Sequence, residues 1–591
     1  MSARLLLPAA PTAAGLTRRR FVQGLAGAGL AALWPRPAWT LRAPDAPGVV
    51  AGTDFDLSVG ETWVNFTGRP RPAVTLGGQL PGPVLRWREG SEVRLRVRNA
   101  LPPGAIHGPD TSIHWHGILL PADMDGVPGL SFDGIRPGES YLYRFRVRQS
   151  GTYWYHSHSG YQEQAGLYGP LIIDPLEPEP FAYERDYVLM LSDWTDLPPA
   201  ALMARLKKMP SYDNTYQRTV ADFLRDAGRD GLRATLRDRA AWGRMRMTPT
   251  DLSDVNAHTY TYLLNGHTAA DNWTALFRPG ERVRLRLING SAMTYFDLRI
   301  PGLEMTIVAV DGQYVHPLTV DELRIAVAET YDVIVQPRGQ EAYTVFAQDA
   351  ARTGWVAGTL ATRPGLRAPV PPLDPRPLLR MADMGHGGGA AMGGMAGMEG
   401  GCGAGMAHAG QAGHAGHAAA GAARLADNPL VDMQAMDPQP RLDDPGVGLR
   451  GNGRRVATYG ALRSLFPDPD GRAPGRELTL HLTGHMERFA WSFDGVKFAQ
   501  STPLRLRHGE RVRIVLVNDT MMSHPIHLHG LWSDLEDADG RFHLRKHTVD
   551  MPPGTRRSYR VRADALGRWA YHCHLFFHME SGMFREVRVE P

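Results

Sequence analysis

Ten of the 23 histidines lie in four short clusters, and imidazole is a common ligand of copper, zinc and iron. The clusters are His114-Trp115-His116, His156-Ser157-His158, His524-Pro525-Ile526-His527-Leu528-His529, and His572-Cys573-His574 with His578. Every cluster contains two histidines separated by one residue, and such residues project from the same face of a strand. Four converging pairs would supply eight imidazoles, about the number that holds three metal ions and leaves positions open for oxygen.

Cys573, one of only two cysteines, lies between two of these histidines. We interpret residues 571–583 as the last strand, in which Cys573 points away from His572 and His574. A thiolate with imidazoles and a distant thioether, here Met583, is the ligand set of a blue-copper electron-transfer site. Zinc also binds histidine and cysteine, but a zinc site does not require a thiolate between histidines of a second centre. The pattern therefore predicts a copper redox enzyme.

One strand pattern occurs three times at domain-sized intervals, in residues 89–99, 279–289 and 508–518. Each copy is a turn containing glycine followed by alternating apolar and polar residues, which predicts a half-buried strand. The first and third copies also share a Pro-Gly pair ahead of a His-X-His strand, with Ser157 in one strand and Cys573 in the other. Strand-rich repeats without long helical patterns indicate an all-β chain of three β-sandwich or Greek-key domains.

The middle copy keeps the strand pattern but has no histidine at the matching positions, so we interpret it as a spacer between the outer copies. The predicted domains are residues 45–178, 179–365 and 451–591. A composition rich in Arg, Ala and Leu predicts a helical insertion at about residues 199–247 of the middle domain. Residues 366–450 are predicted to form a linker.

The N-terminal region has the features of an export signal. Residues 17–22 contain a twin-arginine pattern, and the apolar stretch that follows, residues 22–33, is too short to span a bilayer. We expect residues 1–44 to be a signal and arm, and the mature protein to lie in the periplasm without a membrane anchor. Without the six arginines at positions 4, 18, 19, 20, 36 and 42 the formal charge falls from +4 to −2, which argues against nucleic-acid binding.

The four clusters resemble the four copper-binding motifs of multicopper oxidases, the family of laccases and ascorbate oxidase. This resemblance covers almost the whole chain after the signal and implies three cupredoxin-like domains with four copper ions. It implies a type 1 copper bound by His524, Cys573 and His578 with Met583 axial, and a type 2 copper bound by His114 and His527. It also implies two type 3 coppers, one bound by His116, His156 and His574 and the other by His158, His529 and His572.

The resemblance further implies a path for electrons and a need for protons. A donor gives one electron at a time to the copper at Cys573, and the electron passes along the backbone to His572 and His574 and so to the other three coppers. Four such transfers reduce O2 to water, which consumes protons. Asp125 lies where related enzymes place a carboxylate, and Glu580 is a second candidate for the proton relay. The alternatives are a turn residue for Asp125 and a surface residue for Glu580.

Residues 381–423 combine thioether, imidazole and thiol groups on a chain rich in Gly and Ala. The candidate ligands are Met381, Met384, His386, Met392, Met395, Met398, Cys402, Met406, His408, His414 and His417. Soft ligands of this kind prefer Cu(I), so the segment is expected to bind additional copper; the alternative is a linker without a binding role. With the twin-arginine pattern, the segment resembles the copper-resistance (CopA-type) subfamily of multicopper oxidases.

That resemblance implies a periplasmic enzyme that uses O2 to oxidise Cu(I) to Cu(II). Its partners would be the twin-arginine export machinery and other periplasmic copper-resistance proteins. Two alternatives remain open. One is a laccase-like enzyme that oxidises phenols, and the other is a copper-sequestering protein in which the ten-histidine site is structural.

Overall fold

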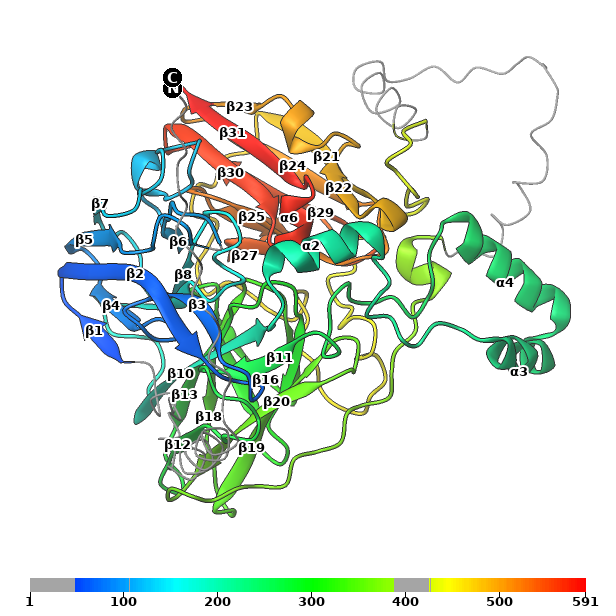
Figure 1. The fold of residues 1–591 in the computed structure, drawn as a ribbon, viewed down its shortest axis with the longest axis horizontal. Helices are drawn as coiled ribbons and strands as arrows, with labels where there is room; N and C mark the ends of the chain where they lie inside the picture. The colour runs from blue at the N-terminus through cyan, green and yellow to red at the C-terminus, as the bar shows by residue number, and fades with distance from the viewer. Residues whose placement is uncertain (1–47, 106, 387–424, 426) are drawn as a thin grey trace, which may run out of the picture. The chain divides into compact units, whose positions relative to one another are not determined.

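The computed structural model describes residues 48–105, 107–386, 425 and 427–591. Six β-sheets are formed by the described residues, two in each of three successive domains, and each domain resembles a cupredoxin (Figure 1). The sheets of the first domain have the orders β1-β4-β9-β8-β6 and β3-β2-β5-β7. Those of the middle domain are β11-β10-β13-β18-β15-β16 and β12-β20-β19-β14-β17. Those of the third are β22-β21-β24-β29-β26-β27 and β23-β31-β30-β25-β28. The predicted all-β fold with three cupredoxin-like domains is thus confirmed.

The first domain contains nine strands, and the two domains that follow contain eleven each among the described residues. The first domain has β1 (Val49–Ala51), β2 (Asp54–Val64), β3 (Arg71–Leu76), β4 (Val84–Arg88), β5 (Glu92–Asn99), β6 (His114–His116), β7 (Ser140–Arg146), β8 (Gly151–His156) and β9 (Tyr168–Asp174). The middle domain has β10 (Arg185–Trp194), β11 (Thr261–Leu264), β12 (Thr274–Leu276), β13 (Val283–Asn289), β14 (Phe296–Arg299), β15 (Met305–Val310), β16 (Gln313–Val320), β17 (Glu322–Ile325), β18 (Thr330–Val335), β19 (Ala342–Asp349) and β20 (Trp355–Ala361). The third domain has β21 (Arg476–His485), β22 (Ala490–Phe493), β23 (Leu504–Arg507), β24 (Arg511–Asn518), β25 (His524–Leu528), β26 (Ser533–Glu536), β27 (Phe542–Lys546), β28 (Thr548–Met551), β29 (Arg556–Arg562), β30 (Gly567–Cys573) and β31 (Phe584–Glu590).

The three repeated segments form equivalent strands, β5, β13 and β24. Each pairs in parallel with the long strand before it, β2, β10 or β21, and antiparallel with β7, β18 or β29. The predicted half-buried alternation is found in β5. It is wrong for β13, where all seven residues are buried because Arg284 and Arg286 are paired with Asp332 and Asp186. Charge pairing lets these polar positions be buried as well.

The last residue of each repeated strand is an asparagine, and its side chain makes the same kind of hydrogen bonds in all three domains. The side-chain amides of Asn99, Asn289 and Asn518 each donate two hydrogen bonds to backbone carbonyls of following loops. In the third domain these carbonyls belong to Met522 and Met551. Met522 lies two residues before His524, so the repeat holds the start of the histidine strand in place.

The prediction of one continuous strand over residues 571–583 is wrong. Strand β30 ends at Cys573, the short helix α6 (Phe576–Glu580) follows, and β31 begins at Phe584. The α6 turn brings His578 back beside Cys573, with the two side-chain atoms Nδ1 and Sγ 3.9 Å apart. In a straight strand, two residues five positions apart in the sequence would be well over 10 Å from each other.

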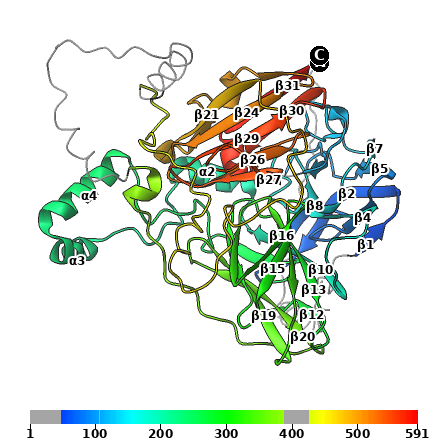
Figure 2. The same cartoon turned by 180° about the vertical axis from the view of Figure 1, so that it is seen from behind.

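Three helices lie within the predicted insertion, namely α2 (Pro199–Lys208), α3 (Val220–Asp230) and α4 (Leu232–Arg244). Helix α2 buries Leu202, Met203 and Leu206, and Lys207 reaches the third domain, where it donates a hydrogen bond to the Phe489 carbonyl. Figures 1 and 2 both show α3 and α4 outside the sheets. The described residues also form four short 3-10 helices, η1 (Ala122–Met124), η2 (Met381–Met384), η4 (Met486–Arg488) and η5 (Phe498–Gln500). Among the described residues, no helix has the length and apolar character needed to cross a membrane.

Candidate metal centres

The four histidine clusters lie on, or just beyond the ends of, two pairs of neighbouring strands, one pair in each outer domain. In the first domain, β6 and β8 are antiparallel and His114 is directly opposite His156. In the third domain, β25 and β30 are antiparallel and His527 is opposite His572. Because alternate residues of a strand share a face, each pair of strands presents its histidines together.

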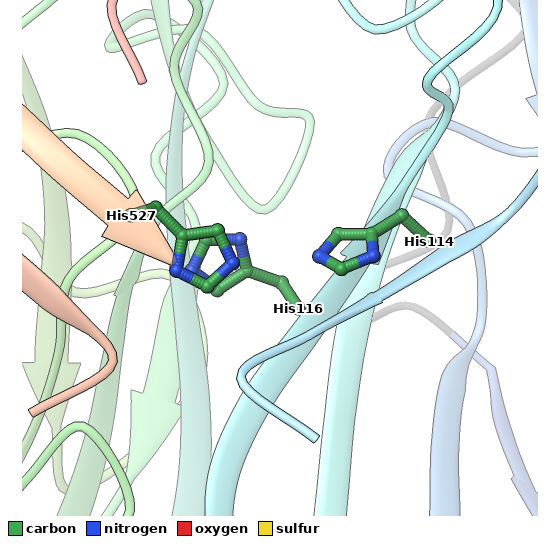
Figure 3. A group of neighbouring side chains, drawn as sticks. All are labelled: His114, His116 and His527. Carbon is green, nitrogen blue, oxygen red and sulfur yellow. The ribbon is translucent and has the colours of Figure 1, made fainter. Parts of the chain in front are cut away.

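The two sets of histidines meet where the first and third domains are in contact. The rings of His116 and His527 are stacked with centroids 3.8 Å apart, and those of His114 and His529 with centroids 3.9 Å apart. Figure 3 shows the His116 and His527 rings overlapping, with the His114 ring beside them. The clusters of both domains therefore form one site, although they are far apart in the sequence.

The structure brings together the members of every predicted ligand set. The nitrogen atoms of His114 and His527 lie together with that of His116, all within 4.8 Å of one another. The same limit holds within the set His116, His156 and His574, and within the set His158, His529 and His572. These residues come from two domains in each set, so each set requires both domains to be folded and docked.

The ring nitrogens that face the centre of this site lack ordinary partners. Four of them are buried without a hydrogen-bond partner among the described residues, namely His114 Nε2, His116 Nδ1, His158 Nε2 and His527 Nε2. Two further pairs face each other, with His529 Nε2 2.9 Å from His572 Nε2 and His156 Nε2 3.3 Å from His574 Nε2. Buried polar atoms without partners are costly, and nitrogens directed at one point are suited to metal ions.

The opposite nitrogens of several of these rings are held by the protein. The His527 Nδ1 atom lies 2.6 Å from the His547 carbonyl, and His572 Nδ1 lies 2.9 Å from the Cys573 carbonyl. A carbonyl can only accept, so each of these Nδ1 atoms carries the proton and each Nε2 atom has a free lone pair. Such outer contacts fix the tautomer and the ring orientation of a metal ligand.

A second group of potential ligands surrounds Cys573. The Cys573 Sγ atom is 3.5 Å from His524 Nδ1 and 3.9 Å from His578 Nδ1, and the two Nδ1 atoms are 3.1 Å apart. All three side chains are fully buried, as is Met583, whose backbone carbonyl accepts a hydrogen bond from the Cys573 amide. The outer nitrogens of the two rings contact Thr520 Oγ1 and Asp254 Oδ2, each at 2.8 Å. A thiolate and two imidazoles are the donor set that selects copper in electron-transfer sites.

Burial determines the protonation of these groups. It lowers the pKa of His572 to about 3, and it lowers the pKa of most other histidines of the site well below the usual range. Burial also raises the pKa of the Cys573 thiol. The imidazoles whose pKa is lowered are therefore neutral and ready to donate a lone pair, whereas the thiolate needs a cation beside it.

Three carboxylates contact the rings from outside. Asp125 is buried, with Oδ2 2.9 Å from His529 Nδ1 and Oδ1 3.3 Å from His114 Nδ1. Glu163 was not predicted; its Oε2 lies 2.8 Å from His156 Nδ1 and its Oε1 lies 3.9 Å from His574 Nδ1. Asp254, which contacts His578, was not predicted either. Burial raises the pKa of Glu163 and raises that of Asp254 to about 7.

The other predicted residues lie at different places. Glu580 is the last residue of α6, and its side chain is exposed. Met381 and Met384 are the ends of η2, and His386 follows with a buried Nε2 that has no hydrogen-bond partner among the described residues. Eight predicted extra-copper ligands lie outside the described residues, namely Met392, Met395, Met398, Cys402, Met406, His408, His414 and His417.

Three family models, each described as multicopper oxidase, match residues 58–178, 185–364 and 471–591, which is more than half of the chain. The chain belongs to the multicopper oxidase family. Enzymes of this family are oxidoreductases that carry copper, and the histidine groups described above fit copper sites. The match includes the middle domain, which contributes no residue to these groups.

The most similar relatives among those found are copper-resistance proteins. The chain is 61% identical to the copper resistance protein A homolog of Pseudomonas syringae pv. tomato, with 97% of this chain and 99% of that protein covered. It is 59% identical, with the same coverage, to copper resistance protein A of Escherichia coli. The multicopper oxidase therefore belongs to the copper resistance protein A subfamily.

Solved structures of the family share the fold at low sequence identity. Fet3p, described as a multicopper oxidase that functions in iron import, has a TM-score of 0.63 at 18% identity, covering 92% of this chain and 91% of that chain. The laccase from Botrytis aclada has a TM-score of 0.60 at 20% identity, covering 93% and 89%. These likenesses extend over nearly the whole multicopper oxidase chain, and they concern the fold alone.

Proposed function

We propose that this multicopper oxidase acts in copper resistance by oxidising Cu(I) to Cu(II) with O2 as the electron acceptor. The observation that carries the proposal is a cavity of about 110 Å³. It adjoins the group formed by His524, Cys573 and His578. Its wall includes the thioethers Met293, Met521 and Met522 and the carboxylates Asp254 and Asp550. Thioethers are soft ligands that suit Cu(I). The wall also contains four arginines, Arg324, Arg441, Arg450 and Arg557, so the methionine sulfurs and not the net charge favour Cu(I) here.

The cavity touches the proposed electron-accepting site on two sides. Met521, Met522 and Ser523 immediately precede His524, and Asp254 contacts His578. An ion held by these side chains would lie close to both imidazoles. The cavity is smaller than the pockets of about 300–1,000 Å³ that hold drug-sized organic ligands, which favours an ion over a large phenol.

In this proposal the ligand roles follow the groups described above. His524, Cys573 and His578, with Met583 as a fourth ligand, would hold the type 1 copper; His114 and His527 would hold the type 2 copper. The two type 3 coppers are held by His116, His156 and His574, and by His158, His529 and His572. When bound, these ions accept electrons singly at one site and deliver four of them to O2 at the other.

The chain supplies the connection between the two sites. Cys573 is covalently joined to His572 and His574, so a ligand of one site is the direct neighbour of two ligands of the other. All ring ligands of both sites are buried except His158, which is half-buried. Asp125 Oδ2 and Glu163 Oε2 lie beside the outer nitrogens of His529 and His156, where each carboxylate can hold a proton for transfer towards the site. Glu580 is a less direct candidate for such a relay, because its side chain is exposed.

We further propose that the protein works in the periplasm and arrives there by the twin-arginine route, as its N-terminal pattern suggests. The Met/His-rich segment would bind additional copper, and other periplasmic copper-resistance proteins would exchange copper with it. The names of the relatives in Pseudomonas syringae and Escherichia coli support the role in copper resistance.

Steady-state O2 consumption with Cu(I) and with a phenol tests the proposal. In the double variant Met521→Leu, Met522→Leu the cavity keeps its size but loses two sulfur ligands. We expect kcat/KM for Cu(I) to fall about tenfold, equivalent to about 1.4 kcal/mol, with kcat/KM for the phenol unchanged. Met305→Leu, a buried methionine of β15 that does not line the cavity, is the matched control.

Three results would contradict the proposal. An unchanged kcat/KM for Cu(I) in the double variant would exclude the cavity as the donor site. A wild-type enzyme that consumes O2 with the phenol but not with Cu(I) would be a laccase-like oxidase. A copper-loaded protein that consumes no O2 with either donor would be a sequestering protein.

A further inference from the structure

The middle domain contributes no ligand to the groups described above, yet one of its turns lies where all three domains meet. This turn is Asp311-Gly312, between β15 and β16. Asp311 has a φ of 49° and Gly312 a φ of 73°, as in a tight hairpin turn. A Cβ at Gly312 would lie 2.3 Å from the Tyr153 ring, so only glycine fits against strand β8, which ends in His156.

The other side of the Asp311-Gly312 turn contacts the third domain. Asp311 Oδ2 is 2.9 Å from Lys546 Nζ and accepts a hydrogen bond of 3.2 Å from the Thr548 amide. Lys546 Nζ also lies 3.0 Å from Glu329 Oε1. All three charged groups are fully buried. One carboxylate of the middle domain is thus bonded to the residues on both sides of His547.

His547 and Thr548 in turn contact two proposed ligands. His116 Nε2 lies 3.2 Å from both His547 Nδ1 and Thr548 Oγ1, which leaves His116 Nδ1 free to face the metal site. The His547 carbonyl lies 2.6 Å from His527 Nδ1, which leaves His527 Nε2 free. Gly117 is needed for this arrangement, because a Cβ there would lie 2.5 Å from the His547 ring.

We infer that Asp311 is a positioning residue for the three-copper site, which is the proposed site of the type 2 copper and the two type 3 coppers. Asp311 fixes residues 546–548, and these residues orient His116 and His527 towards the metal. The inference rests on the ligand roles proposed for these two histidines. It assigns the middle domain a part in building a site to which it gives no ligand.

The energetics of the buried charges agree with this role. Burial disfavours the charged form of Lys546, but Asp311 and Glu329 outweigh it and raise the pKa of the ammonium group. Loss of the Asp311 charge would leave Glu329 as the only carboxylate described beside the buried Lys546 ammonium group, so the charge would be less well compensated. Because Lys546 is the last residue of β27 and Thr548 is the first of β28, a shift of Lys546 would move His547 and Thr548 with it.

The variant Asp311→Asn tests the inference through metal content and spectra. The amide has nearly the same shape as the carboxylate but cannot balance the Lys546 charge. We expect the blue absorbance of the type 1 site to be retained. The electron paramagnetic resonance signal of the type 2 copper should change, and copper occupancy of the three-copper site should fall about tenfold or more at limiting copper.

A second variant and a control separate positioning from folding. Thr548→Val keeps the shape of the side chain but removes the oxygen beside His116 Nε2, a proposed type 3 ligand, and it should lower the copper occupancy of the three-copper site even if Asp311→Asn does not fold. Asp297→Asn removes another fully buried carboxylate of the middle domain, paired with Arg324 and Arg352, and should lower the thermal midpoint without altering the signal.

The outcomes are distinct. A normal type 2 signal and full copper content in Thr548→Val, or in a folded Asp311→Asn, would overturn the inference. So would a proportional loss of type 1 and type 2 copper, because that indicates general unfolding. None of these readouts uses Cu(I) as a donor, so they remain valid if the proposed substrate is wrong. A complete three-copper site in His116→Ala would instead refute the proposed ligand role.

Discussion

The imidazole rings of His116 and His527 are stacked with centroids 3.8 Å apart, although one belongs to the first domain and the other to the third. Their free nitrogens, Nδ1 of His116 and Nε2 of His527, are both buried and unpartnered among the described residues. The docking of the two domains therefore creates the site. Substitutions at single positions can test its parts one at a time.

Replacing the thiol should separate the two centres. Cys573→Ser removes the sulfur that lies 3.5 Å from His524 Nδ1, and a hydroxyl is a poor ligand for copper in an electron-transfer site. We expect the blue absorbance and the oxidase activity to be lost while the histidines of the other site still bind copper. Absorption spectra and copper analysis check this. Ser157→Ala, at the equivalent position of the first domain, should stay blue; a Cys573→Ser protein that stays blue would refute the type 1 assignment.

Glu163 should matter for O2 reduction and not for electron uptake. Glu163→Gln keeps an oxygen near His156 Nδ1 but cannot deliver a proton. We expect reduction of the type 1 site by Cu(I) to keep its rate and reoxidation by O2 to slow by about 100-fold. Rapid mixing of each half-reaction measures the two rates. Equal slowing of both halves would mean that the substitution had disturbed the site as a whole.

Asp468 should stabilise the third domain in a pH-dependent way. Burial opposes ionisation of Asp468, but hydrogen bonds from Arg511 and from the Gly471 and Asp470 amides outweigh it and lower the pKa to about 2. Since the folded pKa lies below the unfolded value of 3.8, the stabilisation is complete above that value and is lost as the pH falls through about 2.

Asp468→Asn should therefore lower the free energy of unfolding at pH 7 by about 1–2 kcal/mol, after allowance for solvent screening. Thermal midpoints of variant and wild type, measured from pH 7 down to pH 2, should converge at the acid end. Asp539→Asn, which removes an exposed partner of Arg541, should change the midpoint little at any pH. A difference between Asp468→Asn and wild type that grows on acidification would contradict the expected direction of the pH dependence.

Deleting residues 387–424 should remove copper beyond four ions per chain and leave the blue colour intact. The deletion keeps η2, and Oδ1 of its residue Asp383 lies 2.5 Å from Arg450 Nη1. Copper analysis after equilibration at a fixed Cu(I) concentration gives the stoichiometry, and O2 uptake gives the rate. Unchanged stoichiometry together with unchanged Cu(I) oxidation would indicate that the segment is only a linker.

Short-range patterns were sufficient to predict the fold class and the pairing of histidines on strand faces, whereas the grouping of the histidines into ligand sets was implied by the resemblance to multicopper oxidases. A period of two places His114 and His116 on one face of a strand, and the repeated Asn-terminated strands reveal three related domains. The copper-resistance subfamily, predicted from the twin-arginine pattern and the Met/His-rich segment, is confirmed by relatives about 60% identical.

Other residues of the site could not be predicted because tertiary contacts alone bring them there. Asp254 reaches His578 from the segment after the helical insertion, and Asp311 reaches Lys546 from another domain. No spacing in the sequence marks either contact. Glu163 had a weak signal, since it follows His156 and His158 closely. The turn at α6 was missed because a helix of five residues is too short for a periodic pattern.

The division of the ligands between β6–β8 and β25–β30 has a consequence for how the protein matures. His572 and His574 are synthesised only after the first and middle domains, so a growing chain cannot complete either of the two type 3 ligand sets before its last strands are made. Insertion of the type 3 coppers would therefore follow translation and domain docking. A chain stopped before β30 would contain His114 and His527 but would lack one histidine of each type 3 set.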